Sequence, residues 1–173
     1  MTIRILSFKV AGQLCGIAVP EVHDVIRGGQ RITHVPRAAA AIIGIMNLRG
    51  RIALAVSLRR YLGLTDTART ADTRAEMSLV IENAGSLYCL AVDSVGEVLS
   101  FEGKAGPVPQ VLDARWRKAV SGVWPCDGAL LAQLDVRGMI DALCAGPDEQ
   151  TPAAPGQMNG YLRGNDENVP YRR

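Results

Sequence analysis

The chain has 173 residues, of which 48% are hydrophobic, and its formal net charge is +2. This length allows one domain with a sizeable core, or two small lobes that share a core, and excludes a peptide-sized scaffold. The weakly basic charge comes without a dense Lys/Arg cluster, which argues against nucleic acid or an anionic membrane surface as the partner. No apolar stretch approaches the roughly 20 residues of a membrane-spanning helix, so we expect no direct membrane insertion.

The cysteines indicate a reducing compartment. Cys15, Cys89, Cys126 and Cys144 lie far apart without a C-x-x-C pair, and the first residues lack the pattern of a secretory leader. We therefore expect a cytoplasmic protein with reduced thiols. Cys15 and Cys89 fall in strand-like segments, where a buried Cys usually behaves as a small hydrophobe.

Strand patterns dominate the chain from its start. Residues 3–10 and 14–19 predict two strands joined by a Gly-containing turn. Residues 42–47 and 51–58 predict a second hairpin around another such turn. Between the two hairpins, the alanines of residues 38–44 favour a helix.

The segments after the second hairpin are less regular. Residues 57–64 are typical of one or two helical turns. Residues 65–76 are polar and indicate a linker or a long surface loop. Residues 147–173 are rich in Pro, Gly and Asn and offer little apolar area to offset their ordering entropy, so we expect a flexible C-terminal tail.

The second half of the chain repeats the first. With an offset of 73 residues, GQLCGIAVPEVHDVI (12–26) aligns with GSLYCLAVDSVGEVL (85–99), and six positions are identical. The offset then becomes 78 and places Gly44 on Gly122. Glycines and apolar positions agree together and in order, so we predict an internal duplication of a β-rich unit.

The duplication predicts the architecture. Each copy has about five short strands, a number at which a small sheet tends to curl into a barrel and remove its own edges. We therefore predict a mainly β fold of two five-stranded barrels related by a pseudo-twofold axis, with short helices. The first lobe would span about 12–64 and the second about 77–143, with the first strand and 65–76 connecting them inside a domain of residues 1–146.

Catalytic and metal-binding patterns are missing from the sequence. Only two histidines occur, His23 and His34, and neither belongs to an H-x-x-x-H or H-E-x-x-H pattern or lies near a nucleophile-elbow Ser. Asp24 and Glu97 are the acidic residues that recur in the repeat, but they would lie on different lobes rather than form a catalytic pair. We expect no catalytic residues, no metal site and no cofactor.

The stretch MNLRGRIALAV, residues 46–56, places an arginine at the tip of a predicted hairpin. A tight turn between antiparallel strands needs φ > 0, which Gly50 adopts without a Cβ clash, and Gly128 takes the same place in the second copy. This geometry does not require Arg49, because Asp127 stands there in the second copy. Arg49 is therefore either an exposed turn charge or a partner-binding residue.

From about Ser7 to Leu143 the chain resembles the CheW coupling proteins of bacterial chemotaxis arrays. The pieces that carry the resemblance are, in order, GIAVPEVHDVI, ITHVP, IIGIMNLRGRIALAVSLRRYLGL, LAVDSVGEVLSF and VSGVWPCDGALLAQLDVRGMI. One such piece would be weak evidence, whereas five in order around the NLRG turn make a specific match. The family has two SH3-like five-stranded β-barrels around a shared core, which agrees with the predicted duplication.

The resemblance implies a non-enzymatic scaffold or adaptor that couples chemoreceptors to a chemotaxis histidine kinase in bacterial signal transduction. The implied partners are the cytoplasmic hairpin tip of a chemoreceptor, near the groove between the lobes, and the regulatory domain of the kinase, itself a CheW-like double barrel. Contacts with other CheW-like domains in closed rings are also implied, since head-to-tail contacts close when the rotation permits. The cytoplasmic protein would then be recruited to membrane-associated receptor arrays.

The resemblance also nominates partner-binding residues. Arg49 and Asn47 stand in the family's NLRG turn, where a planar, permanently charged guanidinium suits carboxylates and carbonyls of a partner helix. Val22 and Asp24 match the family's V-x-E segment beside the receptor groove, and Gly44 matches a position where a partner backbone approaches closely. For Val22 and Gly44, core packing and strand geometry are the alternative.

Two positions depart from the family pattern after the NLRG turn. Leu54 replaces the usual Pro, and Ser57 replaces the usual Asp. Ser57 can cap a helix as Asp does, but the lost negative charge would leave Arg49 freer or alter the choice of partner. These departures leave the fold prediction unchanged.

Two alternatives to the receptor-kinase adaptor stay open from the sequence. One is a CheW-like adaptor of another chemosensory pathway, such as surface motility. The other is a small ligand-binding regulatory double barrel, which would have a deep polar pocket. Single-stranded nucleic-acid binding is poorly supported because only 5% of the residues are aromatic.

Overall fold

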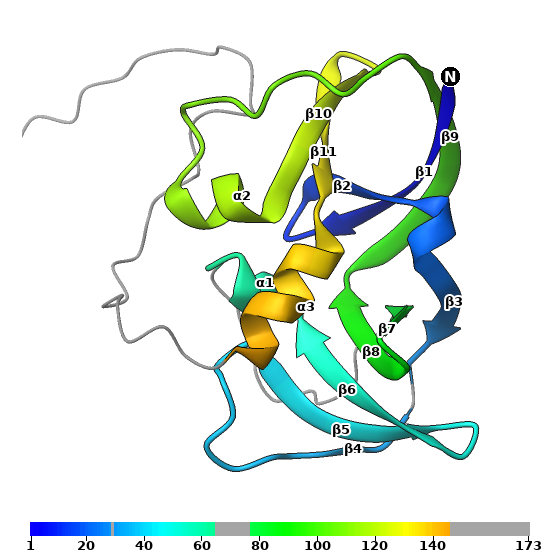
Figure 1. Cartoon of the computed structure of the whole chain (residues 1–173), viewed down its shortest axis with the longest axis vertical. Helices are drawn as coiled ribbons and strands as arrows, with labels where there is room; N and C mark the ends of the chain where they lie inside the picture. The colour runs from blue at the N-terminus through cyan, green and yellow to red at the C-terminus, as the bar shows by residue number, and fades with distance from the viewer. Residues whose placement is uncertain (29, 65–76, 146–173) are drawn as a thin grey trace, which may run out of the picture.

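The computed structural model describes residues 1–28, 30–64 and 77–145. The linker predicted at 65–76 and the tail predicted at 147–173 lie outside the described residues. The described chain forms two β-sheets, one above the other in the view of Figure 1, with short helices. The prediction of a mainly β fold with two sheets and short helices is confirmed.

Sheet A has five strands and sheet B has six. The strands of sheet A are, in spatial order, β10 (Val120–Cys126), β11 (Ala129–Leu134), β2 (Gln13–Ala18), β1 (Thr2–Val10) and β9 (Ser94–Glu102). The strands of sheet B are, in spatial order, β3 (Val22–Arg27), β7 (Met77–Asn83), β8 (Ser86–Val92), β6 (Arg51–Ser57), β5 (Ile42–Leu48) and β4 (Ile32–Thr33). The pairs β2–β11 and β6–β8 are parallel, and the other neighbours are antiparallel.

The sheets do not follow the boundaries of the sequence repeat. The first hairpin of each copy joins the other copy: β1–β2 lies in sheet A beside β9 and β11, and β7–β8 lies in sheet B beside β3 and β6. The lobe bounds expected from the repeat, about 12–64 and 77–143, therefore do not coincide with the two sheets. Sequence similarity shows which residues correspond, but it does not show which copy of a hairpin a strand pairs with.

Neither sheet closes into a barrel by continuous pairing within the described part of the chain. Sheet A comes near to closure, since the chain after β9 forms an isolated antiparallel bridge to β10 between Gly106 and Val123. Two backbone hydrogen bonds of 2.8 and 3.1 Å join these two residues. The corresponding segment in the first copy is the short strand β4, which pairs with β5 in sheet B. The two SH3-like units are thus curled sheets with an open seam.

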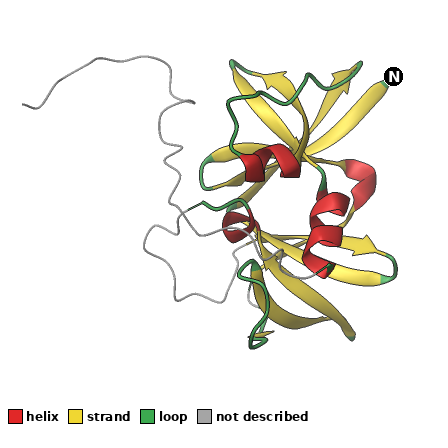
Figure 2. Ribbon diagram, turned by 60° about the vertical axis from the view of Figure 1, so that its left-hand side comes forward, coloured by secondary structure: helices red, strands yellow, loops and turns green. Residues whose placement is uncertain are grey.

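The helices lie at the level between the two sheets in Figure 2. They are η1 (Val19–Glu21, a 3-10 turn), α1 (Leu58–Tyr61), α2 (Ala114–Ala119) and α3 (Val136–Cys144). The side chains of Ser57, Asp113 and Asp135 accept backbone N–H groups at the starts of α1, α2 and α3. The expectation that Ser57 caps the helix in place of Asp is therefore confirmed.

The helix expected from the alanines of residues 38–44 does not form. The chain makes a turn there, with a hydrogen bond of 2.8 Å from Ile42 N to Ala39 O, and β5 begins at Ile42. The β-branched Ile42 and Ile43 favour the extended conformation, and Ile42 pairs with Val56 on β6. Tertiary pairing has overridden a local helix propensity that is too short to nucleate by itself.

Four hairpins turn through two residues of which the second is glycine. The four turns are Ala11–Gly12, Arg49–Gly50, Ala84–Gly85 and Asp127–Gly128, and every one of these residues has positive φ. In the β5–β6 turn φ is 52° at Arg49 and 86° at Gly50, as a type I′ turn requires. An added Cβ at Gly50 would meet nothing within 4 Å, so backbone conformation alone favours glycine there.

Replacing Gly50 by Val will separate this conformational cost from packing. We expect Gly50→Val to lower the free energy of unfolding by about 1–3 kcal/mol, because a β-branched residue is forced to positive φ. Gly50→Asn is the matched control, since Asn tolerates the left-handed region and meets the same open space. Urea denaturation of the two variants measures the difference, and equal losses in both would contradict the turn assignment.

The four cysteines are free and differ in exposure. Cys15 and Cys89 are buried, Cys126 is half-buried and Cys144 is exposed. Burial raises the pKa of the Cys15 thiol to about 12, with a smaller contribution from the negative charge of Asp93. Burial likewise raises the pKa of Cys89 to about 11. Both thiols therefore behave as small apolar side chains, as the sequence predicts.

Thiol reactivity at pH 8 will report this difference, because the thiolate is the nucleophile. We expect Cys144 to react first with a disulfide reagent in the native protein. Cys15 and Cys89 should react only when the chain is unfolded, since a raised pKa keeps them protonated at this pH and burial blocks access. Two fast-reacting thiols from Cys15 and Cys89 in the native state would show that the core is open.

Candidate functional site

The structure brings together two of the residues nominated for partner binding. Arg49 lies at the tip of the β5–β6 hairpin and Asp24 lies on β3, at the edge of sheet B. Arg49 Nη2 is 3.1 Å from Asp24 Oδ2, and the side chains are 80% and 32% exposed. The curl of sheet B carries the hairpin tip across to β3, so two residues from distant strands form one exposed ion pair.

Asn47 and Asp24 are also held by local backbone contacts. Asn47 Oδ1 accepts a hydrogen bond of 2.8 Å from Gly50 N, which fixes the turn that carries Arg49. Asp24 Oδ1 accepts one of 2.8 Å from Val25 N, which leaves Oδ2 for Arg49. Asn47 thus supports the turn from within, while Arg49 extends from it.

A second charged cluster lies beside this pair, and sequence reasoning missed it. Arg51 Nη2 donates to Glu82 Oε1 at 2.8 Å and to Gly85 O at 3.1 Å, and His23 Nδ1 lies 3.5 Å from Glu82 Oε2. The hydrogen bond and charge of Arg51, with a smaller effect of His23, hold the pKa of Glu82 below its usual value. This cluster ties the hairpin tip to the β7–β8 turn.

Val22 and Gly44 sit in more enclosed places. Val22 is half-buried and packs against the apolar core between the sheets. Gly44 is buried, and an added Cβ there would overlap the carbonyl oxygen of Thr33 and crowd Ile32 on β4. The close backbone approach at Gly44 is thus made by the same chain, and Gly122 is crowded in the same way by Ala105 and Gly106. Their part in partner binding remains a prediction.

Exposed aliphatic side chains occur at equivalent positions of the repeat. Val25 on β3 corresponds to Val98 on β9, and Ile52 on β6 corresponds to Leu130 on β11; all four are between 37% and 65% exposed. Scattered apolar residues on a surface are ordinary, and the internal duplication accounts for the same two positions in both copies. The repeat alignment contained this signal, yet an apolar residue in a strand cannot be distinguished from a core residue by pattern alone.

The departure at Ser57 does not act on Arg49. Arg49 precedes β6 and Ser57 ends it, so about 20 Å of extended strand separates them. The carboxylate that faces Arg49 is that of Asp24. The expectation that the missing Asp leaves Arg49 freer is therefore wrong.

Leu54, the other departure from the family pattern, is half-buried and packs against the central core.

The described residues provide no arrangement typical of a metal centre. Among residues 1–28, 30–64 and 77–145, no group of three His, Cys, Asp or Glu side chains is placed to hold a metal ion. None of the helices in the same part of the chain combines the length and the hydropathy of a bilayer-spanning helix.

Three comparisons with known proteins agree with one another. Chemotaxis protein CheW of Thermotoga maritima is 28% identical over 141 residues, which cover 81% of this chain and 89% of that protein. Chemotaxis protein CheW of Rhizobium meliloti is 24% identical over 153 residues, covering 87% and 92%. The crystal structure of the scaffolding protein TtCheW from Thermoanaerobacter tengcongensis matches with a TM-score of 0.65 and 27% identity, over 78% of this chain and 90% of that one.

The family comparison covers the whole described fold. Residues 4–144 match the CheW-like domain, from β1 through the last turn of α3. This span includes both sheets, the exchanged hairpins and the Arg49–Asp24 pair. The chain therefore belongs to the CheW-like domain family.

Proposed function

We propose that this chain is a non-enzymatic scaffold that couples chemoreceptors to a chemotaxis histidine kinase. Membership of the CheW-like family supports the scaffold role, since the relatives are chemotaxis proteins and the matched structure is that of a scaffolding protein. The proposed partners are the cytoplasmic hairpin tip of a chemoreceptor and the regulatory domain of the kinase. Recruitment to membrane-associated receptor arrays would follow from the first of these contacts.

The observation that carries the proposal is the exposed Arg49–Asp24 pair. An ion pair this exposed contributes about 0–1 kcal/mol to stability, and a non-glycine residue with φ of 52° carries a conformational cost. The fold therefore gains little from arginine at this position. Ala11, Ala84 and Asp127 hold a similar positive φ at the same turn position, so the turn geometry does not account for an arginine, which supports a role for its exposed guanidinium in binding a partner.

The chemistry of this surface suits an amphipathic helical partner. The Arg49 guanidinium is a planar fork that donates to carboxylates and carbonyls. Ile52, on β6 just after the turn, is an exposed apolar residue close to Arg49 in sequence, whereas Val25 faces the side of β3 opposite to Asp24. In this proposal the Arg49 guanidinium contacts carboxylates or carbonyls of the receptor hairpin tip.

The opposite end of the molecule fits a second contact. Leu130 on β11 is exposed and Asp127 occupies the turn position that Arg49 has in sheet B. Opposite turn charges and exposed apolar residues therefore occur at the β5–β6 turn of one CheW-like domain and at the β10–β11 turn of another. Such a heterologous contact, with the kinase regulatory domain or with other CheW-like domains, closes into rings when the rotation permits.

Reversing the charge of Arg49 tests the proposal. We expect Arg49→Glu to weaken binding to the receptor hairpin tip or to the kinase regulatory domain at least about tenfold, because it loses a charge-assisted contact at the interface. The melting temperature should change little, since the exposed ion pair contributes little to stability. Titration calorimetry with each partner from the same genome measures the affinity.

Two further variants make the result specific. Arg4→Glu makes the same charge change at an exposed residue of β1 and should leave both affinities unchanged. The exchanged pair Arg49→Asp with Asp24→Arg keeps an ion pair but moves its charges, and should remain as weak as Arg49→Glu if Arg49 itself contacts the partner. Unchanged affinity of Arg49→Glu for both partners would remove Arg49 from the site.

A further inference from the structure

The chain crosses between the sheets at two places, and a carboxylate marks each one. The first crossing is η1, which leads from β2 in sheet A to β3 in sheet B and ends at Glu21. The second is Asp93, which lies between β8 in sheet B and β9 in sheet A. A strand begins directly after each crossing, and each of these two strands carries an exposed valine, Val25 on β3 and Val98 on β9.

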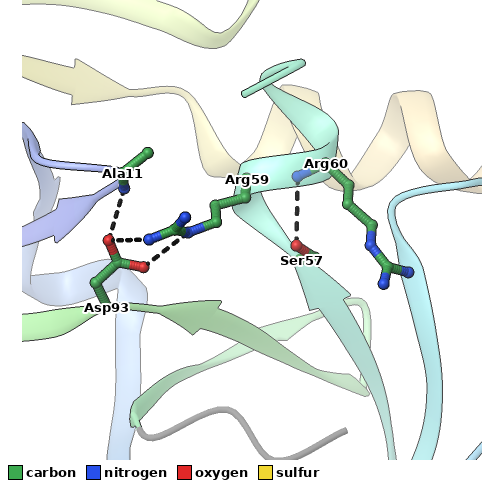
Figure 3. Close-up of polar contacts among 5 residues, drawn as sticks. All are labelled: Ala11, Ser57, Arg59, Arg60 and Asp93. Carbon is green, nitrogen blue, oxygen red and sulfur yellow. Dashed lines mark hydrogen bonds and ion pairs between the residues drawn. The ribbon is translucent and has the colours of Figure 1, made fainter. Parts of the chain in front are cut away.

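Asp93 joins three separate parts of the molecule, as Figure 3 shows. Its carboxylate accepts hydrogen bonds from Arg59 Nε at 3.0 Å and Arg59 Nη2 at 2.7 Å, so α1 is held by a two-point contact. The same carboxylate accepts one of 2.7 Å from Ala11 N in the β1–β2 turn. In addition, Asp93 N donates to Lys9 O on β1 at 2.9 Å.

The first crossing has a weaker counterpart of this cluster. Arg137 corresponds to Arg59 at the offset of 78, and its Nε lies 3.7 Å from Glu21 Oε1. This distance is too long for a good hydrogen bond, and the Arg137 side chain is 66% exposed against 28% for Arg59. The two arginines are equivalent in the repeat, but their carboxylate partners are not, since Glu21 aligns with Ser94, and the two ion pairs differ in quality.

The difference matters because β9 starts directly after Asp93. A bidentate Arg–carboxylate contact has a defined geometry, whereas the contact of the exposed Arg137 at 3.7 Å from Glu21 does not. The negative charge of Asp93 also acts on the buried thiol of Cys15 on β2 and helps to raise its pKa. The start of β9 is therefore held by contacts with both sheets, and the start of β3 is held less firmly.

We propose that Arg59 and Asp93 are positioning residues that set the placement of β9 relative to β3, and with it the spacing of the surfaces that meet a partner. This inference deepens the proposed scaffold function and rests on it for the role of those surfaces. The contacts of Asp93 with Arg59 and Ala11 fix the start of β9. The Arg137–Glu21 pair holds the start of β3 less firmly, so the position of β3 can vary more.

A distance measurement within the free protein tests the positioning. Spin labels are attached at Arg27→Cys on β3 and Ser100→Cys on β9, both exposed, in a chain that also carries Cys126→Ser and Cys144→Ser. We expect Asp93→Asn to shift and broaden the distance distribution measured by pulsed electron spin resonance. Glu21→Gln is the matched control and should leave the distribution close to that of the parent.

A role limited to stability would lower the melting temperature without moving the labels in the folded protein. Superimposable distributions for Asp93→Asn and the parent, or an equal shift for Glu21→Gln, would overturn the inference. If Asp93→Asn does not fold, Arg59→Gln takes its place with the same criteria, since it removes the fork and keeps the carboxylate for Ala11.

Binding of the kinase regulatory domain is measured on the same variants. We expect Asp93→Asn to lose about tenfold in affinity, because a β9 surface that is no longer held in place must be ordered when the partner binds, and Glu21→Gln to lose much less. A loss of affinity without a change in label distance would overturn the positioning role. If the parent chain binds neither this domain nor a receptor tip, the proposed function fails, while the label distances still decide whether Asp93 positions β9.

Discussion

The two sheets depend on one apolar layer that they share. Leu6, Phe8 and Ile17 from sheet A and Leu79 and Leu90 from sheet B belong to a single buried cluster. Each sheet also has a smaller core of its own, but the exchange of hairpins means that neither sequence copy contains a complete sheet. Burial of the shared layer therefore requires both copies at once, so the halves fold as one unit through contacts distant in sequence.

The sequence pattern predicts the local elements well because they depend on local physics. Gly50 and Gly128 mark turns that need positive φ, and alternation of apolar residues marks the strands that flank them. The exchange of hairpins was not predictable in the same way. A hairpin such as β1–β2 presents the same apolar pattern to its own copy as to the other one. In the described residues, the crossings at η1 and Asp93 are too short to return the next strand to the same sheet, and they carry no periodic signal.

The candidate site was predictable as a set of residues but not as a set of contacts. The resemblance to a family nominates Arg49 and Asp24 separately, and only the curl of sheet B shows that they form an ion pair. Arg51 and Glu82 escaped notice because they lie 31 residues apart on different strands. At Gly44 the close approach of Thr33 of the same chain accounts for the glycine, and its contact with a partner backbone stays a prediction.

The two equivalent hairpin turns, β5–β6 and β10–β11, carry opposite charges, so the two ends of the molecule differ. If the two tips were identical, each could meet a copy of itself, and nothing would distinguish one end of the molecule from the other. Here the β5–β6 turn carries Arg49 with Asp24 beside it, whereas the equivalent β10–β11 turn carries Asp127. The apolar neighbours Ile52 and Leu130 are retained at both tips, so attraction is available at each end while charge distinguishes them. The proposed scaffold function would use this difference between the ends for head-to-tail contacts with different partners.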